Sequence, residues 1–187
     1  MADRFAHPAY ETTVAIVGKY VRLHDAYLSV SEALRHAGCD AHSRIRIKWV
    51  ESEDVNEQSA AEIFHDVQGI CMPGGFGSRG IEGKIAAAKY AREHNVPYLG
   101  LCLGMQISVI EFARNVLGYQ DANSNEFNES STHKVIDFMP DQNDEMDKGG
   151  TMRLGAYPCV IKAGTLLEKC YGENLIQERH RDRKSVV

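Results

Sequence analysis

The sequence predicts an α/β fold, a three-layer sandwich in which helices cover both faces of a mostly parallel central sheet. Short runs rich in β-branched or apolar residues alternate with helical stretches from residue 12 to about residue 117. Glycines follow several of these runs directly, as they do where strands turn into loops. The length of 187 residues suits one domain, and we expect residues 1–187 to form it.

The first half of the chain supplies five predicted elements. Residues 12–18 form a β-branched run that ends in glycine, typical of a buried parallel strand. Apolar residues recur at helical spacing over 25–38, and Gly38 is predicted to cap that helix. Apolar and basic residues alternate over 45–49, which predicts a half-buried strand. A helix over 60–67 and a strand over 69–72 follow.

The second half of the chain has clear helix and strand patterns up to about residue 117 and weaker ones after it. Residues 81–94 are rich in Ala, Lys and Glu and predict a helix, and 97–101 predict the next strand. A helix is predicted over 103–117, with an apolar face of Ile107, Ile110, Val116 and Leu117. Stretches rich in Asn, Asp and Gly predict loops at 121–130 and 140–150, and strands are expected at 134–138 and 157–162.

Composition excludes several functional classes. Apolar residues make up 43% and charged residues 25%, and the net charge of −5 is spread without a basic stripe, so we expect no nucleic-acid partner. The chain shows no apolar run long enough to span a membrane and no apolar signal-peptide core near Met1. Five cysteines without a CxxC pair favour neither a disulfide framework nor a metal site. These features predict a cytoplasmic protein.

The central chemical feature is Gly100-Leu101-Cys102-Leu103-Gly104, between a predicted strand and a predicted helix. A nucleophile flanked by two glycines in this context is typical of a tight, strained turn that lifts the side chain above the sheet. At the helix N-terminus the macrodipole favours a thiolate, so we expect the pKa of Cys102 to be lowered. The backbone N–H of Leu103 is expected to face a developing oxyanion. The alternative is that Cys102 is a small buried residue.

A second feature is the loop Pro73-Gly74-Gly75-Phe76-Gly77, directly after the strand predicted at 69–72. Adjacent glycines let backbone N–H groups approach a ligand closely, although such a loop alone is weak evidence. Neighbouring strand ends face one crevice in a doubly wound sheet. We therefore expect this loop to supply the other half of the oxyanion hole.

Together these strings resemble the class I glutamine amidotransferases, a family with a flavodoxin-like fold. Three further strings resemble the CTP synthase branch of that family: residues 77–84, 123–127 and 149–155. The similarity runs from about Met1 to Arg183, and residues 1–11 resemble the linker that joins an amidoligase domain to the glutaminase domain.

The resemblance implies a role for each matching position. Cys102 corresponds to the nucleophile that attacks L-glutamine, and Gly75 and Leu103 to the oxyanion donors. The substrate-binding positions are Gly74, Gly75, Phe76, Leu103, Gln106, Glu126 and Arg183. Glu126 is chemically suited to the α-ammonium group, and Arg183 to the α-carboxylate. Arg79 falls in a loop that the family links to activation by GTP.

The resemblance is incomplete at the family's catalytic His-x-Glu string, which does not occur in this sequence. After Cys102 the only histidines are His133, expected to be solvated in a loop, and His180, in a string that positions substrate in the family. Asp182 replaces a family histidine. Because departing ammonia requires a general acid, we expect little turnover from a chain that is C-terminally incomplete.

In the family, the released ammonia converts UTP to CTP with ATP and Mg²⁺ in the amidoligase domain, within a homotetramer active in pyrimidine nucleotide biosynthesis. We expect no cofactor in the glutaminase part. Two alternatives stay open at this point: a catalytically inactive module that binds glutamine, and another α/β protein with a cysteine elbow, such as a stress-type hydrolase or chaperone.

Overall fold

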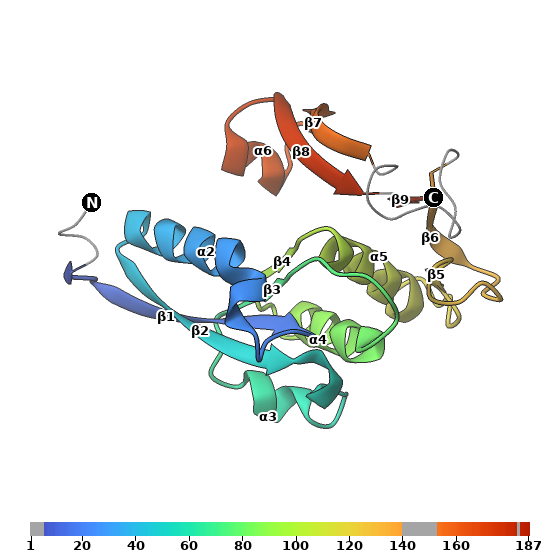
Figure 1. Cartoon of the computed structure of the whole chain (residues 1–187), viewed down its shortest axis with the longest axis horizontal. Coiled ribbons are helices and arrows are strands. Elements are labelled where there is room, and N and C mark those ends of the chain that lie inside the picture. Colours follow the sequence, from blue (N-terminus) through green and yellow to red (C-terminus); the bar gives the residue numbers. More distant parts are fainter. Residues whose placement is uncertain (1–5, 140–152, 183) are drawn as a thin grey trace. The chain divides into compact units, whose positions relative to one another are not determined.

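The structure is a computed structural model, and it describes residues 6–139, 153–182 and 184–187. The chain divides into two compact units, Met1–Ile136 with Val186–Val187 and Asp137–Ser185 (Figure 1). No helix of the described residues is long and apolar enough to cross a membrane.

The centre of the first unit is a four-stranded sheet in the order β2-β1-β3-β4. Its strands are β1 (Tyr10–Gly18), β2 (Ser43–Glu51), β3 (Gly69–Met72) and β4 (Tyr98–Gly100), and all neighbouring pairs are parallel. Parallel neighbours require crossover connections. These contain α2 (Leu28–Asp40), the 3₁₀ turn η2 (Ser52–Asp54) with α3 (Ala60–Phe64), and α4 (Ile81–Glu93).

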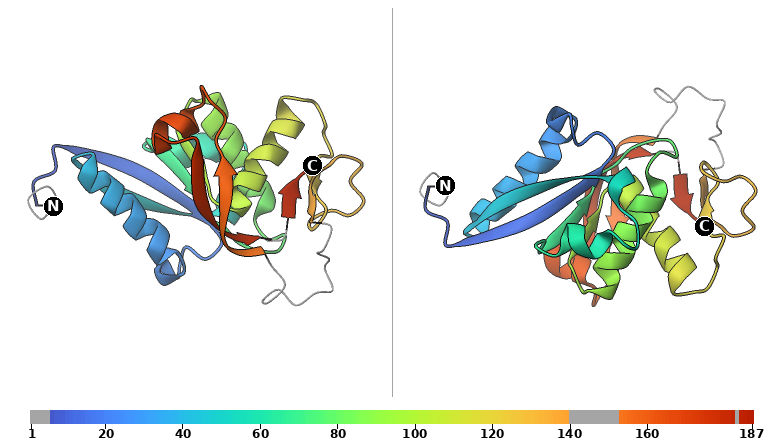
Figure 2. Two further views of the ribbon diagram at one scale, coloured as in Figure 1. Left: turned by 90° about the horizontal axis from the view of Figure 1, so that it is seen from above. Right: turned by 90° about the horizontal axis from the view of Figure 1, so that it is seen from below.

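Successive side chains of β1 explain how the helices cover this sheet. Ala15 and Val17 belong to a buried cluster with α3, α4 and α5 (Leu103–Asn115). Ile16 points to the other face, where Val30 and Leu34 of α2 pack. Helices therefore cover both faces, as Figures 1 and 2 show, and the predicted three-layer α/β sandwich is confirmed.

Two details of the predicted helices are wrong. The first helix starts with the 3₁₀ turn η1 (His24–Tyr27) and continues to Asp40, so Gly38 does not cap it. A Cβ on Gly38 would lie 2.5 Å from the Ile45 side chain, and the left-handed conformation falls on His42, with φ 53°. At the other end of the unit, α5 ends at Asn115, which leaves Val116 and Leu117 outside the helix and exposed.

The chain beyond α5 forms short strands. A three-stranded sheet has the order β5-β6-β9, with β5 (Asn123–Ser124), β6 (Lys134–Phe138) and β9 (Lys184–Val186). The strand predicted at 134–138 is confirmed, and the loop predicted over 121–130 contains the two residues of β5. The loop predicted at 140–150 lies outside the described residues.

The second unit contains an antiparallel pair, β7 (Arg153–Val160) and β8 (Leu175–Asp182), joined through α6 (Leu166–Tyr171). The strand predicted at 157–162 therefore begins and ends earlier than expected. Asp182 faces Arg153 across the pair and accepts two hydrogen bonds from its guanidinium, at 2.9 and 2.7 Å. The residue that departs from the family string thus holds one end of this hairpin together.

Candidate active site

Cys102 stands on a sharp turn between β4 and α5. Its backbone adopts φ 54° and ψ −105°, a conformation that L-residues rarely adopt outside strained functional turns. The thiol is exposed. Cys102 is the N-cap residue of α5, directly before Leu103, the first residue of the helix. The cysteine sulfur therefore lies beside the positive end of α5.

Both glycines of the elbow are required by close backbone contacts. A Cβ on Gly104 would lie 2.1 Å from the carbonyl oxygen of Met72, the last residue of β3. A Cβ on Gly100 would lie 2.5 Å from the carbonyl carbon of Gly104. Only glycine allows α5 to start this close to the strand ends.

The loop over residues 73–77, here called the glycine loop, passes directly beside the cysteine. A Cβ on Gly74 would lie 3.4 Å from the Cys102 Cβ and 3.9 Å from its Sγ. A Cβ on Gly75 would lie 3.6 Å from Leu103 Cδ2. The structure thus brings Gly74 and Gly75 together with Cys102 and Leu103, although β3 and β4 are separated by the whole of α4.

Two cations connect the glycine loop and the segment after it to the end of β1. The Lys19 ammonium donates a hydrogen bond to the Phe76 carbonyl. Arg79 donates to the Lys19 carbonyl at 2.6 Å and to the Glu53 carboxylate at 3.0 Å. Sequence reasoning missed Lys19, although a lysine directly after a buried strand, at the carboxyl edge of the sheet, was an available signal.

Two of the proposed substrate-binding side chains lie close to these elements. Glu126 Oε1 accepts a hydrogen bond at 3.2 Å from the N–H of Gly77, in the glycine loop. Gln106, on the first turns of α5, is 3% exposed, and its Oε1 accepts no hydrogen bond from the residues that the structure describes. Phe76 is partly exposed on the glycine loop. Arg183 lies outside the described residues.

Burial shifts two titratable groups near the strand ends. Lys84 is 1% exposed, and burial, together with the charges of Lys19 and Arg79, lowers the pKa of its ammonium to about 8. Burial raises the pKa of the Cys71 thiol to about 11, so this thiol is a poor nucleophile at neutral pH. Cys102, in contrast, combines exposure with the start of a helix.

The histidines of the first unit with described contacts are engaged with other groups. His24 stacks on Trp49 and His94 on Tyr90. His133 is exposed as predicted, but it is not simply solvated. Its Nδ1 lies 2.5 Å from Asp121 Oδ1. In the second unit, His180 packs against the edge of Tyr157.

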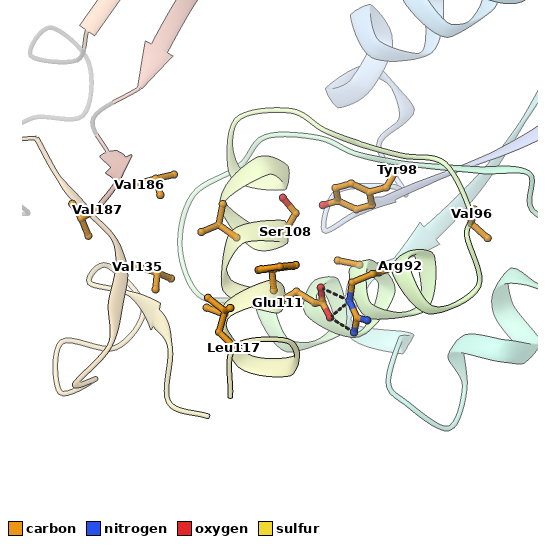
Figure 3. A pocket seen from close by; sticks show the side chains of 13 residues that line it. Arg92, Val96, Tyr98, Ser108, Glu111, Leu117, Val135, Val186 and Val187 are labelled. Atoms are coloured by element: carbon orange, nitrogen blue, oxygen red, sulfur yellow. Dashed lines mark hydrogen bonds and ion pairs between the residues drawn. The ribbon is translucent and has the colours of Figure 1, made fainter. Parts of the chain in front are cut away.

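A cavity of about 600 Å³ lies elsewhere in the first unit, between α5, the end of α4 and β6 (Figure 3). Its wall is mostly apolar, with the ion pair of Arg92 and Glu111 on one side. None of the predicted site residues that the structure describes lines it. Among the described residues, no group of three or more His, Cys, Asp or Glu side chains is arranged to hold a metal ion.

Comparison with known proteins identifies relatives along nearly the whole chain. The family described as "Glutamine amidotransferase class-I" matches residues 22–187. The chain is 55% identical over 183 residues to a CTP synthase of Carboxydothermus hydrogenoformans, which covers 98% of this chain and 34% of that protein. It is 58% identical over 184 residues to a CTP synthase of Roseiflexus castenholzii, covering 98% of this chain and 33% of that protein.

A solved structure is also similar: the glutaminase domain of Trypanosoma brucei CTPS with bound acivicin. It superposes with a TM-score of 0.85 at 41% identity and covers 94% of this chain and 68% of that one. The chain spans about a third of the length of the curated relatives that it matches.

Proposed function

Because the chain belongs to the class I glutamine amidotransferase family, we propose that it is the glutamine-hydrolysing part of a CTP synthase-like enzyme. One observation carries the proposal: the exposed thiol of Cys102 lies at the start of α5 with the glycine loop against it. A nucleophile beside closely packed backbone is what acyl transfer through a covalent intermediate requires.

The proposed reaction follows from this arrangement. The Cys102 thiolate attacks the side-chain amide carbon of L-glutamine, and the carbonyl oxygen becomes an oxyanion that accepts hydrogen bonds from the N–H groups of Leu103 and Gly75. The C–N bond then breaks, the leaving nitrogen takes a proton from solvent and departs as ammonia, and a γ-glutamyl thioester remains. Water cleaves the thioester, which releases L-glutamate and regenerates the thiol.

The remaining site residues bind the substrate in this proposal. Glu126 pairs with the α-ammonium group, and its hydrogen bond to Gly77 supports a position beside the glycine loop. Gln106 has a buried carbonyl oxygen to which no described residue donates a hydrogen bond, and a substrate N–H group can supply one. Gly74 and Phe76 form the wall of the pocket, and Arg183 binds the α-carboxylate.

The wider activity belongs to the longer protein. An amidoligase domain of the same polypeptide takes up the ammonia to convert UTP to CTP with ATP and Mg²⁺, within a cytoplasmic homotetramer. The threefold greater length of the relatives supports this division of labour. GTP acts as an activator through the loop that carries Arg79, and the glutaminase part itself uses no cofactor.

A second candidate function is a glutamine-binding or regulatory module without turnover. The observation that favours it is that Glu126 lies beside the glycine loop, since a binding role requires the substrate-binding residues and no turnover.

Thioester trapping separates the two candidates. The chain is mixed with L-glutamine and quenched in acid, and its intact mass is compared with that of Cys102→Ala treated in the same way. A calorimetric titration with glutamine measures binding separately. Our proposal predicts an adduct equal to glutamine less ammonia on Cys102 only. Glutamine binding without an adduct would support the binding module, and neither binding nor adduct would refute both.

A further inference from the structure

One carboxylate, that of Asp121, adds side-chain bonds to a loop that carries Glu126 and whose base is already paired between β5 and β6. This loop, residues 122–132, leaves the end of α5 and returns to β6, and Asp121 stands at its start. Asp121 Oδ2 accepts hydrogen bonds from the backbone N–H of Thr132, at 2.6 Å, and from the Thr132 hydroxyl, at 2.7 Å. The Ser131 hydroxyl donates to the Asp121 carbonyl at 2.6 Å. Both ends of the loop are therefore joined through Asp121.

His133 completes this closure. Its Nδ1 lies 2.5 Å from Asp121 Oδ1, and its ring stacks on Tyr119 with 4.5 Å between centroids and 16° between planes. The His133 carbonyl accepts a hydrogen bond from Asn123 at 3.0 Å. The hydrogen bonds from Thr132 and His133 hold the pKa of the Asp121 carboxyl well below its usual range.

The loop closed in this way meets the glycine loop at Glu126. Arg114, on α5, donates to the Ala122 carbonyl at 2.7 Å and fixes the first residue of the loop. Glu126 then reaches Gly77 through the 3.2 Å hydrogen bond to its N–H. An exposed ion pair alone contributes little. Here, however, the Asp121 side chain accepts hydrogen bonds from Thr132 at the far end of the loop. The segment between Asp121 and Thr132 carries Glu126, a proposed ligand of the substrate.

We infer that Asp121 and His133 are positioning residues for glutamine recognition: they close the 122–132 loop and so hold Glu126 beside Gly77, where it meets the α-ammonium group. The inference rests on the proposed function, and in particular on the role of Glu126. Without the Asp121 bonds the loop keeps its β5–β6 pairing but loses the side-chain connection between its two ends, so Glu126 samples more positions. Ordering the loop on binding then lowers affinity without changing the nucleophile.

Inactivation kinetics with acivicin test this role, because acivicin carries an amino-acid head group. The full chain is compared with Asp121→Ala and Asp121→Asn, and labelling is resolved into KI and the limiting rate kinact. Asp121→Ala should raise KI about tenfold with little change in kinact, since preorganisation is lost but the thiol is not. Asp121→Asn keeps an acceptor for Thr132, so its KI should lie between those of wild type and Asp121→Ala. Asp66→Ala removes another exposed aspartate, one that is paired with Lys48 at 2.6 Å, and should behave as wild type.

Two further measurements separate positioning from damage to the fold. Iodoacetamide lacks the head group, so its rate with Cys102 should stay the same in all variants. In a Glu126→Ala background, Asp121→Ala should add nothing to KI, because both act through one contact. A wild-type KI in Asp121→Ala, an additive effect in the double variant, or a joint loss of iodoacetamide reactivity and thermal stability would overturn the inference. If acivicin labels even the wild type without protection by glutamine, the proposed function itself fails.

Discussion

Gly74 lies against Cys102. A Cβ added at Gly74 would lie 3.9 Å from the Cys102 sulfur, which is ordinary van der Waals contact. The contact joins two strand ends, since Gly74 follows β3 and Cys102 follows β4. Met72 pairs with Gly100 in the parallel register of these strands. The register of two neighbouring strands therefore sets the distance between the nucleophile and the glycine loop.

The elbow should be intolerant of a methyl group at Gly104. In Gly104→Ala the new Cβ meets the Met72 carbonyl at 2.1 Å, and neither backbone can move without disturbing β3 or α5. We expect a loss of at least ~2 kcal/mol in the free energy of unfolding, measured by urea denaturation. Gly69→Ala is the matched control, because the nearest atoms to its Cβ lie 3.8 Å away. Equal stabilities of the two variants would contradict the described packing.

Lys84 should make stability depend on alkaline pH. Its folded pKa of about 8 lies below the ordinary 10.5, so between these values the unfolded chain binds more protons than the folded one. Stability should therefore rise with pH from 8 to about 10.5. The full shift corresponds to roughly 3 kcal/mol.

The variant Lys84→Met, of similar size, isolates this effect from the titration of other groups. It should be more stable than wild type at pH 7, and the difference should shrink as the pH approaches 10.5. Denaturation of both proteins across this range measures the difference. A difference that is constant with pH would show that Lys84 does not titrate as its burial implies.

Gln106 should be more important for binding than for stability. Its buried Oε1 accepts no hydrogen bond within the described part of the chain, and an unsatisfied buried acceptor costs about 1–3 kcal/mol. Gln106→Leu should therefore unfold at an equal or higher urea concentration, while glutamine protects Cys102 less well against acivicin. A variant that loses stability but keeps full protection would contradict the proposed role.

The ion pair beside the cavity of Figure 3 should be structural. Arg92 Nε and Nη2 lie 2.8–3.1 Å from the oxygens of Glu111, whose side chain is only 4% exposed. Arg92→Ala leaves that carboxylate buried and should cost about 3 kcal/mol in the free energy of unfolding. Arg35→Ala, which removes an exposed pair with Glu32, should cost less than ~0.5 kcal/mol. Similar losses of unfolding free energy in the two variants would mean that leaving the buried Glu111 carboxylate unpaired does not destabilise the fold.

Local patterns predicted the elements that position the nucleophile. The apolar run of β1 and the glycines around Cys102 are patterns within a few residues of sequence. The structure has a strand at the first and a turn between β4 and α5 at the second, as predicted. β8 was not predicted, because after Leu175 and Ile176 both its exposed and its half-buried positions are filled by polar or charged residues and give no apolar period.

Contacts between residues that are far apart in the sequence could not be predicted from local patterns. Lys19 lies 57 residues before Phe76, so its tether exists only because the ends of β1 and β3 are neighbours. His133 was assigned to solvent because its neighbours are polar, whereas its actual partners, Asp121 and Tyr119, are brought to it by the return of the 122–132 loop.

Labelling of the five cysteines with acivicin tests the central claim most directly. The intact chain is incubated with and without L-glutamine, and the modified residue is located by peptide mapping, with Cys102→Ala as control. We predict one adduct, on Cys102, that glutamine suppresses, while the buried Cys39 and Cys71 stay unmodified. No adduct, or labelling that reaches the exposed Cys170 equally and ignores glutamine, would contradict the assignment of a glutamine site at Cys102.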